Sequence, residues 1–262
     1  MARGDDLERI ETALGRARSI MGGFTPGEVE HRRKSGGDPV TEADQAVDAA
    51  LLASLPRDGE GWLSEETVDD AVRLECERVW IVDPLDGTKE FVQGIPEWGV
   101  SVGLVEQGRA VAGGVLIPSR ELTIVGAVVR GVRVNGEPCR SRDLVSLAGA
   151  EILASRSEVG RGEWERFRDA PFRVHPMGSV ACKMALVAGG LADATWTLVP
   201  KHEWDVAAGT ALVVAAGGEV WTPDGLSPVF NKRMPLFPGL VASPAGIADA
   251  IKRFLNRAGT GA

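Results

Sequence analysis

The sequence predicts a protein with two unlike halves, an α+β half over residues 1–145 and an α/β half over residues 146–262. Between residues 99 and 134, short β-prone segments follow one another with glycine turns between them, which is typical of an antiparallel meander. In the second half, apolar strand segments alternate with apolar helical segments, which is typical of a sheet covered by helices. Because no long linker separates the halves, we expect one packed body.

The first half opens with two predicted helices. Apolar residues recur at helical spacing over residues 5–22, which predicts an amphipathic helix. Residues 31–40 are basic and glycine-rich, and they predict an exposed, mobile loop. Thr41 then opens a second helical pattern, and Asp44 follows three residues later, as in a capping box.

Two predicted strands of this half end in acidic residues. A short strand at residues 62–63 leads into the adjacent pair Glu65 and Glu66, and a buried strand at residues 79–82 leads into Asp83. Adjacent ionised carboxylates repel each other, and a cation bound nearby would offset this repulsion. Taken alone, however, such a pair is also typical of solvated glutamates at a helix start.

The second half contains the alternating pattern. Its predicted strands are residues 152–155, 192–197, 219–221 and 240–242, and its predicted helices are residues 179–188, 206–216 and 245–257. Asp205 stands beside Trp204 at the start of the second of these helices. An ordinary helix cap and a functional carboxylate are both consistent with that position.

Composition excludes several classes of function. The net charge is -8 and basic residues form only short clusters, so binding to a nucleic-acid polymer is not expected. The three cysteines are odd in number and lack a CxxC spacing, which indicates reduced thiols rather than disulfides or a zinc site. No signal core or bilayer-length apolar segment is present. We therefore expect a cytoplasmic protein with no membrane contact.

The segment after the buried strand, DPLDGT at residues 83–88, carries the strongest chemical signal. A sharp turn there would aim the carboxylates of Asp83 and Asp86 and the Leu85 carbonyl at one point. Gly87 and Thr88 would then start a helix, where free N–H groups favour a phosphate. Oxygen ligands beside an anion site suit a hard cation such as Mg²⁺, although a short Asp-Gly motif is often only a turn.

Four motifs in order extend this signal to a family. They are DPVTEAD at residues 38–44, the acidic pair 65–66, DPLDGT at 83–88 and WDVAAG at 204–209. Over nearly the whole chain the sequence resembles the inositol monophosphatase superfamily, which includes inositol monophosphatases, 3'(2'),5'-bisphosphate nucleotidases, histidinol-phosphatases and fructose-1,6-bisphosphatases. The resemblance implies a layered α-β-α-β-α sandwich and a lithium-sensitive, Mg²⁺-dependent phosphomonoester hydrolase.

The resemblance also implies a set of metal ligands. Glu65, Asp83 and the Leu85 carbonyl would hold one Mg²⁺, and Asp83, Asp86 and Asp205 would hold a second. A third, weaker ion would depend on Glu65. The expected cofactor is therefore two to three Mg²⁺ ions.

The implied reaction is attack of a metal-activated water on the phosphate. The Thr88 hydroxyl, oriented by Asp44, would position that water and relay its proton, with Glu65 assisting. The backbone N–H groups of Gly87 and Thr88 would bind the phosphate. No covalent phosphoenzyme is needed.

Several positions bear on the substrate. Lys89 and Glu90 resemble the bisphosphate nucleotidases, and Leu198 replaces a glutamate that binds a sugar hydroxyl in inositol-preferring members. Gly178 and Ser179 match the family's substrate wall. A lysine near this wall could pair with a second phosphate, and the candidates are Lys183 and Lys201, with His202 beside them.

We therefore expect a small phosphorylated substrate, first of all adenosine 3',5'-bisphosphate converted to AMP and phosphate. The alternatives are inositol-1-phosphate or another sugar phosphate, and then histidinol phosphate. A non-catalytic binding or regulatory protein on this fold is a further alternative. It predicts the loss of a metal carboxylate, and none is missing here. The sequence leaves open whether the protein is a monomer or a homodimer.

Overall fold

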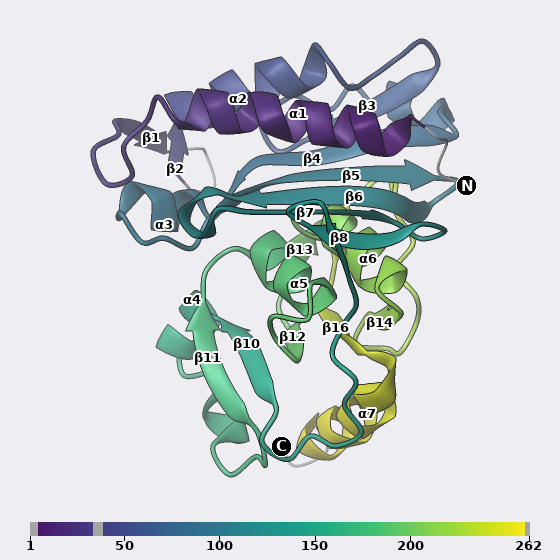
Figure 1. The fold of residues 1–262 in the computed structure, drawn as a ribbon. Helices are drawn as coiled ribbons and strands as arrows, with labels where there is room; N and C mark the ends of the chain where they lie inside the picture. The colour runs from purple at the N-terminus through teal and green to yellow at the C-terminus, as the bar shows by residue number, and fades with distance from the viewer. Residues whose placement is uncertain (1–4, 34–38, 260–262) are drawn as a thin grey trace.

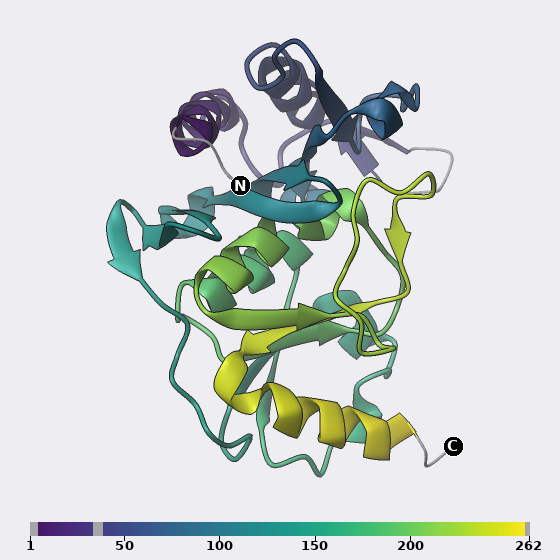
Figure 2. The same ribbon diagram turned by 90° about the vertical axis from the view of Figure 1, so that its right-hand side faces the viewer.

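The computed structural model describes residues 5–33 and 39–259. Five layers are stacked: helices α1 (Asp6–Met21) and α2 (Glu42–Leu52), a seven-stranded sheet, helices α5 (Val180–Ala188) and α6 (Glu203–Ala215), a five-stranded sheet, and helix α7 (Ala245–Gly259) (Figures 1 and 2). The predicted α-β-α-β-α sandwich is confirmed.

The large sheet comes entirely from the first half of the chain. In spatial order it contains β3 (Glu60–Ser64), β4 (Arg78–Asp86), β5 (Gly99–Glu106), β6 (Arg109–Ile117), β7 (Leu122–Ala127), β8 (Gly131–Val134) and β9 (Glu137–Cys139). β3 is parallel to β4, and each later pair is antiparallel. The predicted meander is therefore present, with one parallel strand added at its edge.

The small sheet comes from the second half. Its spatial order is β11 (Arg173–Met177), β10 (Glu151–Ser155), β12 (Ala194–Thr197), β16 (Leu240–Pro244) and β14 (Gly218–Trp221). β10 is parallel to both of its neighbours, whereas β16 is antiparallel to β12 and β14. Sequence analysis did not predict β11, because this edge strand is largely polar and exposed and contains a proline.

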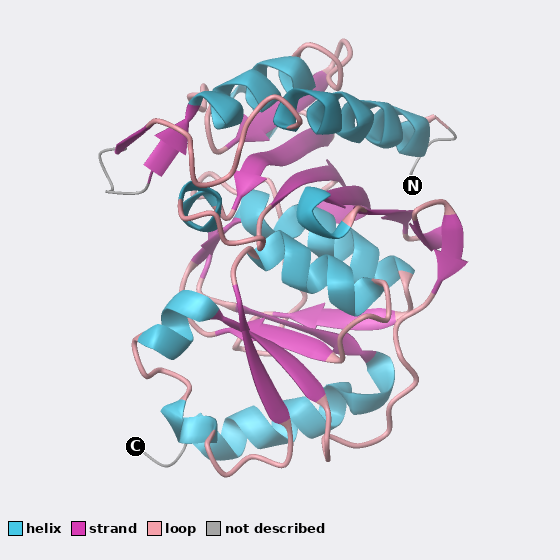
Figure 3. Cartoon of the chain, turned by 60° about the vertical axis from the view of Figure 1, so that its left-hand side comes forward, coloured by secondary structure: helices cyan, strands magenta, loops and turns pink. Residues whose placement is uncertain are grey.

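Helices α5 and α6 lie between the two sheets (Figure 3). In α6 every residue from Val206 to Val213 is buried. A stretch enclosed on all sides has no polar face, which explains why Thr210 is its only polar side chain. A second core lies between the large sheet and helices α1 and α2, and a third, rich in aromatic rings, lies between the small sheet and α7.

The predicted loop at residues 31–40 is wrong at both of its ends. β1 (His31–Arg33) and β2 (Pro39–Thr41) pair as antiparallel strands, with Arg32 opposite Val40. Basic side chains do not prevent this pairing, because a two-stranded ribbon can keep them in solvent. The middle of the predicted loop, residues 34–38, lies outside the described residues.

Short elements complete the chain. They are α3 (Thr88–Val92), α4 (Arg156–Gly160), the strand pair β13 (Lys201–His202) and β15 (Leu236–Phe237), and 3₁₀ turns at Val72–Glu75, Pro118–Arg120 and Glu165–Phe167. Within the described residues, no helix has both the length and the apolar character needed to cross a bilayer.

Candidate active site

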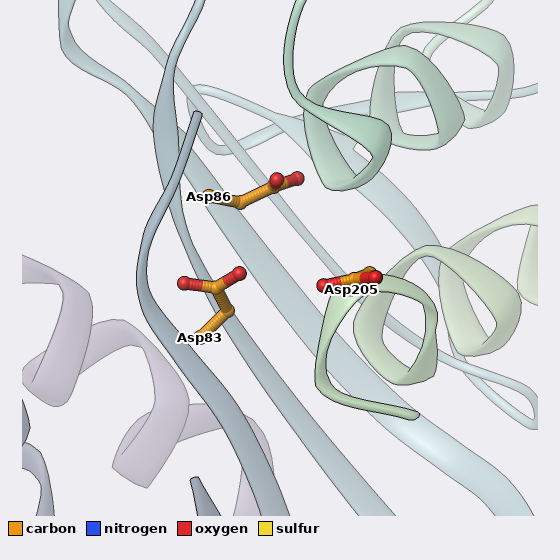
Figure 4. Close-up of side chains that lie close together, drawn as sticks. All are labelled: Asp83, Asp86 and Asp205. Carbon is orange, nitrogen blue, oxygen red and sulfur yellow. The ribbon is translucent and has the colours of Figure 1, made fainter. Parts of the chain in front are cut away.

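Three carboxylates from two distant segments meet between the large sheet and α6. β4 is buried along its whole length and carries Asp83 and Asp86 at its end, where its pairing with β5 shifts register. Asp205 comes from the first turn of α6. Carboxylate oxygens of the three residues lie within 4.8 Å of one another (Figure 4). The structure therefore gathers the predicted second metal group.

The three carboxylates repel one another in a buried setting. Burial is the main cause that raises the pKa of Asp83 well above its usual value, and the charges of Glu65 and Asp86 add to it. The pKa of Asp205 is raised in the same way, by burial and then by Asp86 and Glu65. Such a cluster is stabilised by a bound cation, and its all-oxygen donors suit a hard one such as Mg²⁺.

Local hydrogen bonds orient two of these three carboxylates. Asp83 Oδ1 accepts from the Leu85 N–H at 2.9 Å, which closes a tight turn across Pro84. Asp205 Oδ2 accepts from the His202 N–H at 2.9 Å, as part of a capping box. This box explains why α6 begins at residue 203, three residues before the predicted start.

The turn after β4 requires a glycine. Gly87 has φ of +97°, and a Cβ at this position would lie 2.8 Å from the carbonyl oxygen of Glu97. Only glycine adopts this conformation without strain and fits so close to another backbone segment. Helix α3 then begins at Thr88.

Thr88 connects this turn to α2. Its Oγ1 lies 3.1 Å from Asp44 Oδ1 and 2.9 Å from the Leu85 carbonyl oxygen, so its single proton can go to either acceptor. The predicted capping box is present, because Asp44 Oδ2 accepts from the Thr41 N–H and hydroxyl at 2.8 and 2.6 Å. Burial raises the pKa of Asp44 despite these hydrogen bonds.

Glu65 stands next to the carboxylate cluster rather than inside it. It is close enough to raise the pKa of Asp83, Asp86 and Asp205, but it is not one of the three carboxylates within 4.8 Å of one another. Its loop is attached to α2 through Asp48, whose carboxylate accepts from the hydroxyls of Ser64 and Thr67. Sequence analysis did not identify Asp48, which lies one helical turn after Asp44.

A cavity of about 220 Å³ opens over this cluster. The predicted site residues among its lining are Glu65, Asp83, Leu85, Asp86, Gly87, Thr88, Lys89, Gly178, Ser179, Lys183, Lys201 and Asp205. Asp44, a predicted catalytic residue, is outside the lining, and its Oδ1 lies 3.1 Å from the Thr88 hydroxyl. A larger hollow of about 830 Å³ lies beside β6 and α6, but valines make up much of its lining and the carboxylate cluster is elsewhere.

Comparison with known proteins agrees with this geometry. The model of the "Inositol monophosphatase family" matches residues 7–256. The chain belongs to the inositol monophosphatase family. It is therefore a phosphatase, and its fold and its carboxylate cluster fit that activity.

Relatives within the family differ in their named substrates. The chain is 34% identical to an inositol-1-monophosphatase of Mesorhizobium japonicum, over 82% of this chain and 84% of that protein. It is 35% identical to a 3'-phosphoadenosine 5'-phosphate phosphatase of Mycobacterium leprae, over 79% of each. The solved IMPase structure of Thermotoga maritima superposes with a TM-score of 0.82 at 27% identity, over 97% of this chain and 98% of that one.

Three lining residues of this family member were missed by sequence analysis. Ser155 ends β10, Arg156 and Ser157 follow it, and all three line the cavity. Ser155 caps α4 by accepting from the Glu158 N–H. Polar residues directly after a predicted strand were the signal that could have found them, as they were for Asp83.

Lys183 lies in the lining but its ammonium group is already bonded. Its Nζ donates to the carbonyl oxygens of Met177, Gly178 and Ser179 at 3.2, 3.3 and 3.0 Å. Three acceptors match the three hydrogens of an ammonium group. The predicted contact with a second phosphate would have to compete with these bonds.

Leu198 lies away from the cavity that the carboxylates share. It packs against the aromatic core between the small sheet and α7, and it lines a separate hollow near Trp196. A leucine here is consistent with the apolar surroundings of that core.

Proposed function

We propose that this chain is a Mg²⁺-dependent phosphomonoesterase that acts on a small phosphorylated substrate. The observation that carries the proposal is the cluster of Asp83, Asp86 and Asp205 at the base of a cavity large enough for a phosphate group. These three carboxylates would hold Mg²⁺, with Glu65 and the Leu85 carbonyl as the further ligands. Bound Mg²⁺ would lower the pKa of a water and offset the negative charge of the phosphate.

The protein's own groups would orient the reactants. Thr88 can accept a hydrogen bond from a water while it donates to Asp44 or to the Leu85 carbonyl. Its hydroxyl would thereby position the attacking water, and Glu65 would assist in taking its proton. The backbone N–H groups of Gly87 and Thr88 would bind the phosphate oxygens.

We propose adenosine 3',5'-bisphosphate as the first substrate to test. Lys89 and Lys201 line the cavity and bring positive charge that would attract a second phosphate. The relative named 3'-phosphoadenosine 5'-phosphate phosphatase supports the same choice. The product would be AMP, and cleavage would occur at the phosphate nearest the carboxylates.

Inositol-1-phosphate is the second candidate. The relative named inositol-1-monophosphatase supports it at almost the same identity. Leu198 argues against this substrate. In the inositol-preferring enzymes a glutamate at the corresponding position binds an inositol hydroxyl, whereas here a leucine packs against an apolar core. Histidinol phosphate ranks third, and a non-catalytic binding protein ranks last.

The test is a phosphate-release panel over these three substrates. We expect fastest turnover of adenosine 3',5'-bisphosphate with Mg²⁺, none with EDTA, and inhibition by Li⁺. Faster turnover of inositol-1-phosphate would overturn the substrate but keep the reaction. No release from any substrate by a folded, Mg²⁺-saturated protein would favour the non-catalytic alternative, and Asp83→Asn provides the inactive reference.

A further inference from the structure

The turn between β11 and α5, here named the wall turn (residues 177–181), has an unfavourable backbone conformation. Ser179 has φ of +51° and ψ of 113°, in a region that residues with a side chain rarely adopt. A strained residue of this kind persists only when its surroundings hold it in place. The hydrogen bonds of the wall turn show which residues stabilise this conformation and which carboxylate the turn contacts.

The wall turn is bonded directly to one of the cluster carboxylates. Asp86 Oδ2 accepts from the Ser179 hydroxyl at 2.8 Å and from the Ala181 N–H at 2.6 Å. Ser179 Oγ also accepts from the Cys182 N–H at 3.0 Å, so the same hydroxyl caps α5. Two donors on one carboxylate oxygen fix the plane of the Asp86 carboxylate relative to Asp83 and Asp205.

Two charged side chains are hydrogen-bonded to the backbone of the wall turn. Glu97 Oε2 accepts from the Gly178 N–H at 2.7 Å, and Arg156 binds the same carboxylate through Nε at 3.0 Å. Lys183 Nζ donates to three successive carbonyls of the turn, as described above. Charge-assisted hydrogen bonds to backbone groups are stronger than neutral ones, so they can hold a strained segment.

Glu97 and Lys183 lie on different halves of the chain. Glu97 precedes β5 in the first half, and Lys183 belongs to α5 in the second. Glu97 does not line the cavity over the carboxylates, and the Lys183 ammonium is bonded to the backbone. Their contacts therefore point to the turn rather than to a substrate.

We propose that Glu97 and Lys183 are positioning residues for the metal site. They hold the wall turn in the conformation that lets Ser179 and Ala181 orient Asp86. The inference rests on the proposed function, because the orientation of Asp86 affects activity only if this carboxylate binds Mg²⁺. It also explains why Lys183 lines the cavity without a free ammonium group to offer a phosphate.

The decisive measurement is Mg²⁺ binding to the full chain without substrate, by isothermal titration calorimetry. We expect Glu97→Ala to weaken Mg²⁺ binding by about 10-fold, the low end of the effect of residues behind metal ligands. Glu97→Gln should have a smaller effect, because its amide oxygen can still accept from the Gly178 N–H. Lys183→Met should weaken binding at least as much as Glu97→Ala.

Steady-state kinetics supply the second readout. In Glu97→Ala the Mg²⁺ concentration for half-maximal activity should rise by the same factor of about 10, with KM for the phosphate ester changed less than about twofold at saturating Mg²⁺. Glu151→Ala is the matched control, since Glu151 also accepts from an arginine, Arg173, at 2.9 Å, but at the start of β11, the opposite end of this strand from the wall turn. This control should bind Mg²⁺ like the wild type.

Three outcomes separate this inference from the proposed function. If the wild type is active and Glu97→Ala binds Mg²⁺ normally, the inference is overturned and the function stands. A rise in KM for the ester without weaker Mg²⁺ binding also overturns it, because it makes Glu97 a substrate residue. If no ester is hydrolysed while the variants still bind Mg²⁺ more weakly, the function fails and the inference stands. Should Lys183→Met not fold, Glu97→Ala alone decides.

Discussion

The two walls of the active site are built in different ways. The first wall, the segment from Asp83 to Thr88, is a strand end and a turn that is closed by short-range hydrogen bonds, such as that between Asp83 and Leu85, and its Asp86 is bonded to the second wall. The second wall, the turn at residues 177–181, depends on Glu97, more than 80 positions away in the sequence, and on the buried Lys183. A local motif thus supplies the ligands on one side, whereas long-range charged contacts hold the other.

This difference predicts which substitutions the site can tolerate. The first wall should fail when one of its own residues changes, because turn geometry and ligands coincide there. The second wall should also respond to residues that touch no reactant.

The largest effect is expected from removing one carboxylate of the cluster, either Asp83 of the first wall or Asp205 of α6. Asp83→Asn and Asp205→Asn should each lower kcat/KM by on the order of 10³-fold, because each removes a charged ligand worth several kcal/mol of transition-state stabilisation. Phosphate release at saturating Mg²⁺ measures this. Near-wild-type activity in Asp205→Asn would show that Asp205, the carboxylate contributed by the second half of the chain, is not a metal ligand.

A melting experiment distinguishes ligand loss from misfolding. Burial and then the charges of Glu65 and Asp86 raise the pKa of Asp83, so an ionised Asp83 destabilises the metal-free fold. In EDTA at pH 7, Asp83→Asn should therefore melt at a higher temperature than the wild type, although it is inactive. A lower Tm together with lost activity would indicate a folding defect instead.

Removal of the Thr88 hydroxyl should have the next largest effect. Thr88→Ala should lower kcat by about 10²-fold, the low end for a group that orients a water or its proton. Mg²⁺ affinity should stay nearly constant, because the hydroxyl is bonded to Asp44 and a carbonyl rather than placed among the carboxylates. Thr88→Ser keeps the hydroxyl and should retain most activity, and an unchanged kcat in Thr88→Ala would remove this residue from the mechanism.

Replacing one glycine of each wall with alanine compares how much stability each wall loses when a Cβ is added. Gly87→Ala adds a Cβ 2.8 Å from the Glu97 carbonyl oxygen at a φ of +97°, so we expect a loss of about 2–3 kcal/mol in the free energy of unfolding. In Gly178→Ala the new Cβ would instead lie 2.5 Å from the Glu90 side chain, and a side chain can move away. Its cost should be about 1 kcal/mol.

A double variant checks that explanation. Glu90→Ala removes the atoms that the new Cβ would meet at position 178, so Gly178→Ala should be less destabilising in that background. Chemical denaturation of the four proteins of this cycle gives the coupling. Equal losses for Gly87→Ala and Gly178→Ala would contradict the contrast between a backbone obstacle and a side-chain obstacle.

The contrast between the walls also explains what the sequence could predict. The two unlike halves followed from strand and helix patterns, whereas the fold layers and the grouping of Asp83, Asp86 and Asp205 followed from the family resemblance that the motifs carry. The roles of Glu97 and Arg156 did not, because no local periodicity signals a contact between segments 59 residues apart. Lys183 was placed near the site, but its bonds to three backbone carbonyls depend on a turn whose conformation the sequence does not reveal.

The smallest effect is expected on stability, from a carboxylate that is bonded to the strand leading into the first wall. Glu60 accepts hydrogen bonds from Arg9 and from the Trp80 indole, and Trp80 belongs to the strand that ends at Asp86. Burial alone would raise the pKa of Glu60, but these donors, together with Arg78, lower it to about 2. Removing its charge in Glu60→Gln should cost about 2 kcal/mol of unfolding free energy at pH 7.

The pH dependence of that loss identifies its origin. A folded-state pKa near 2, below the usual 4.5, means that ionised Glu60 stabilises the fold fully above about pH 5 and loses this contribution as the pH falls toward 2. The difference in unfolding free energy between the wild type and Glu60→Gln should therefore shrink over this range. Glu163→Gln removes an exposed carboxylate paired with Arg161 and should change stability by less than about 0.5 kcal/mol at any pH. A difference for Glu60→Gln that does not vary with pH would show that its packing, and not its charge, stabilises the strand beneath the site.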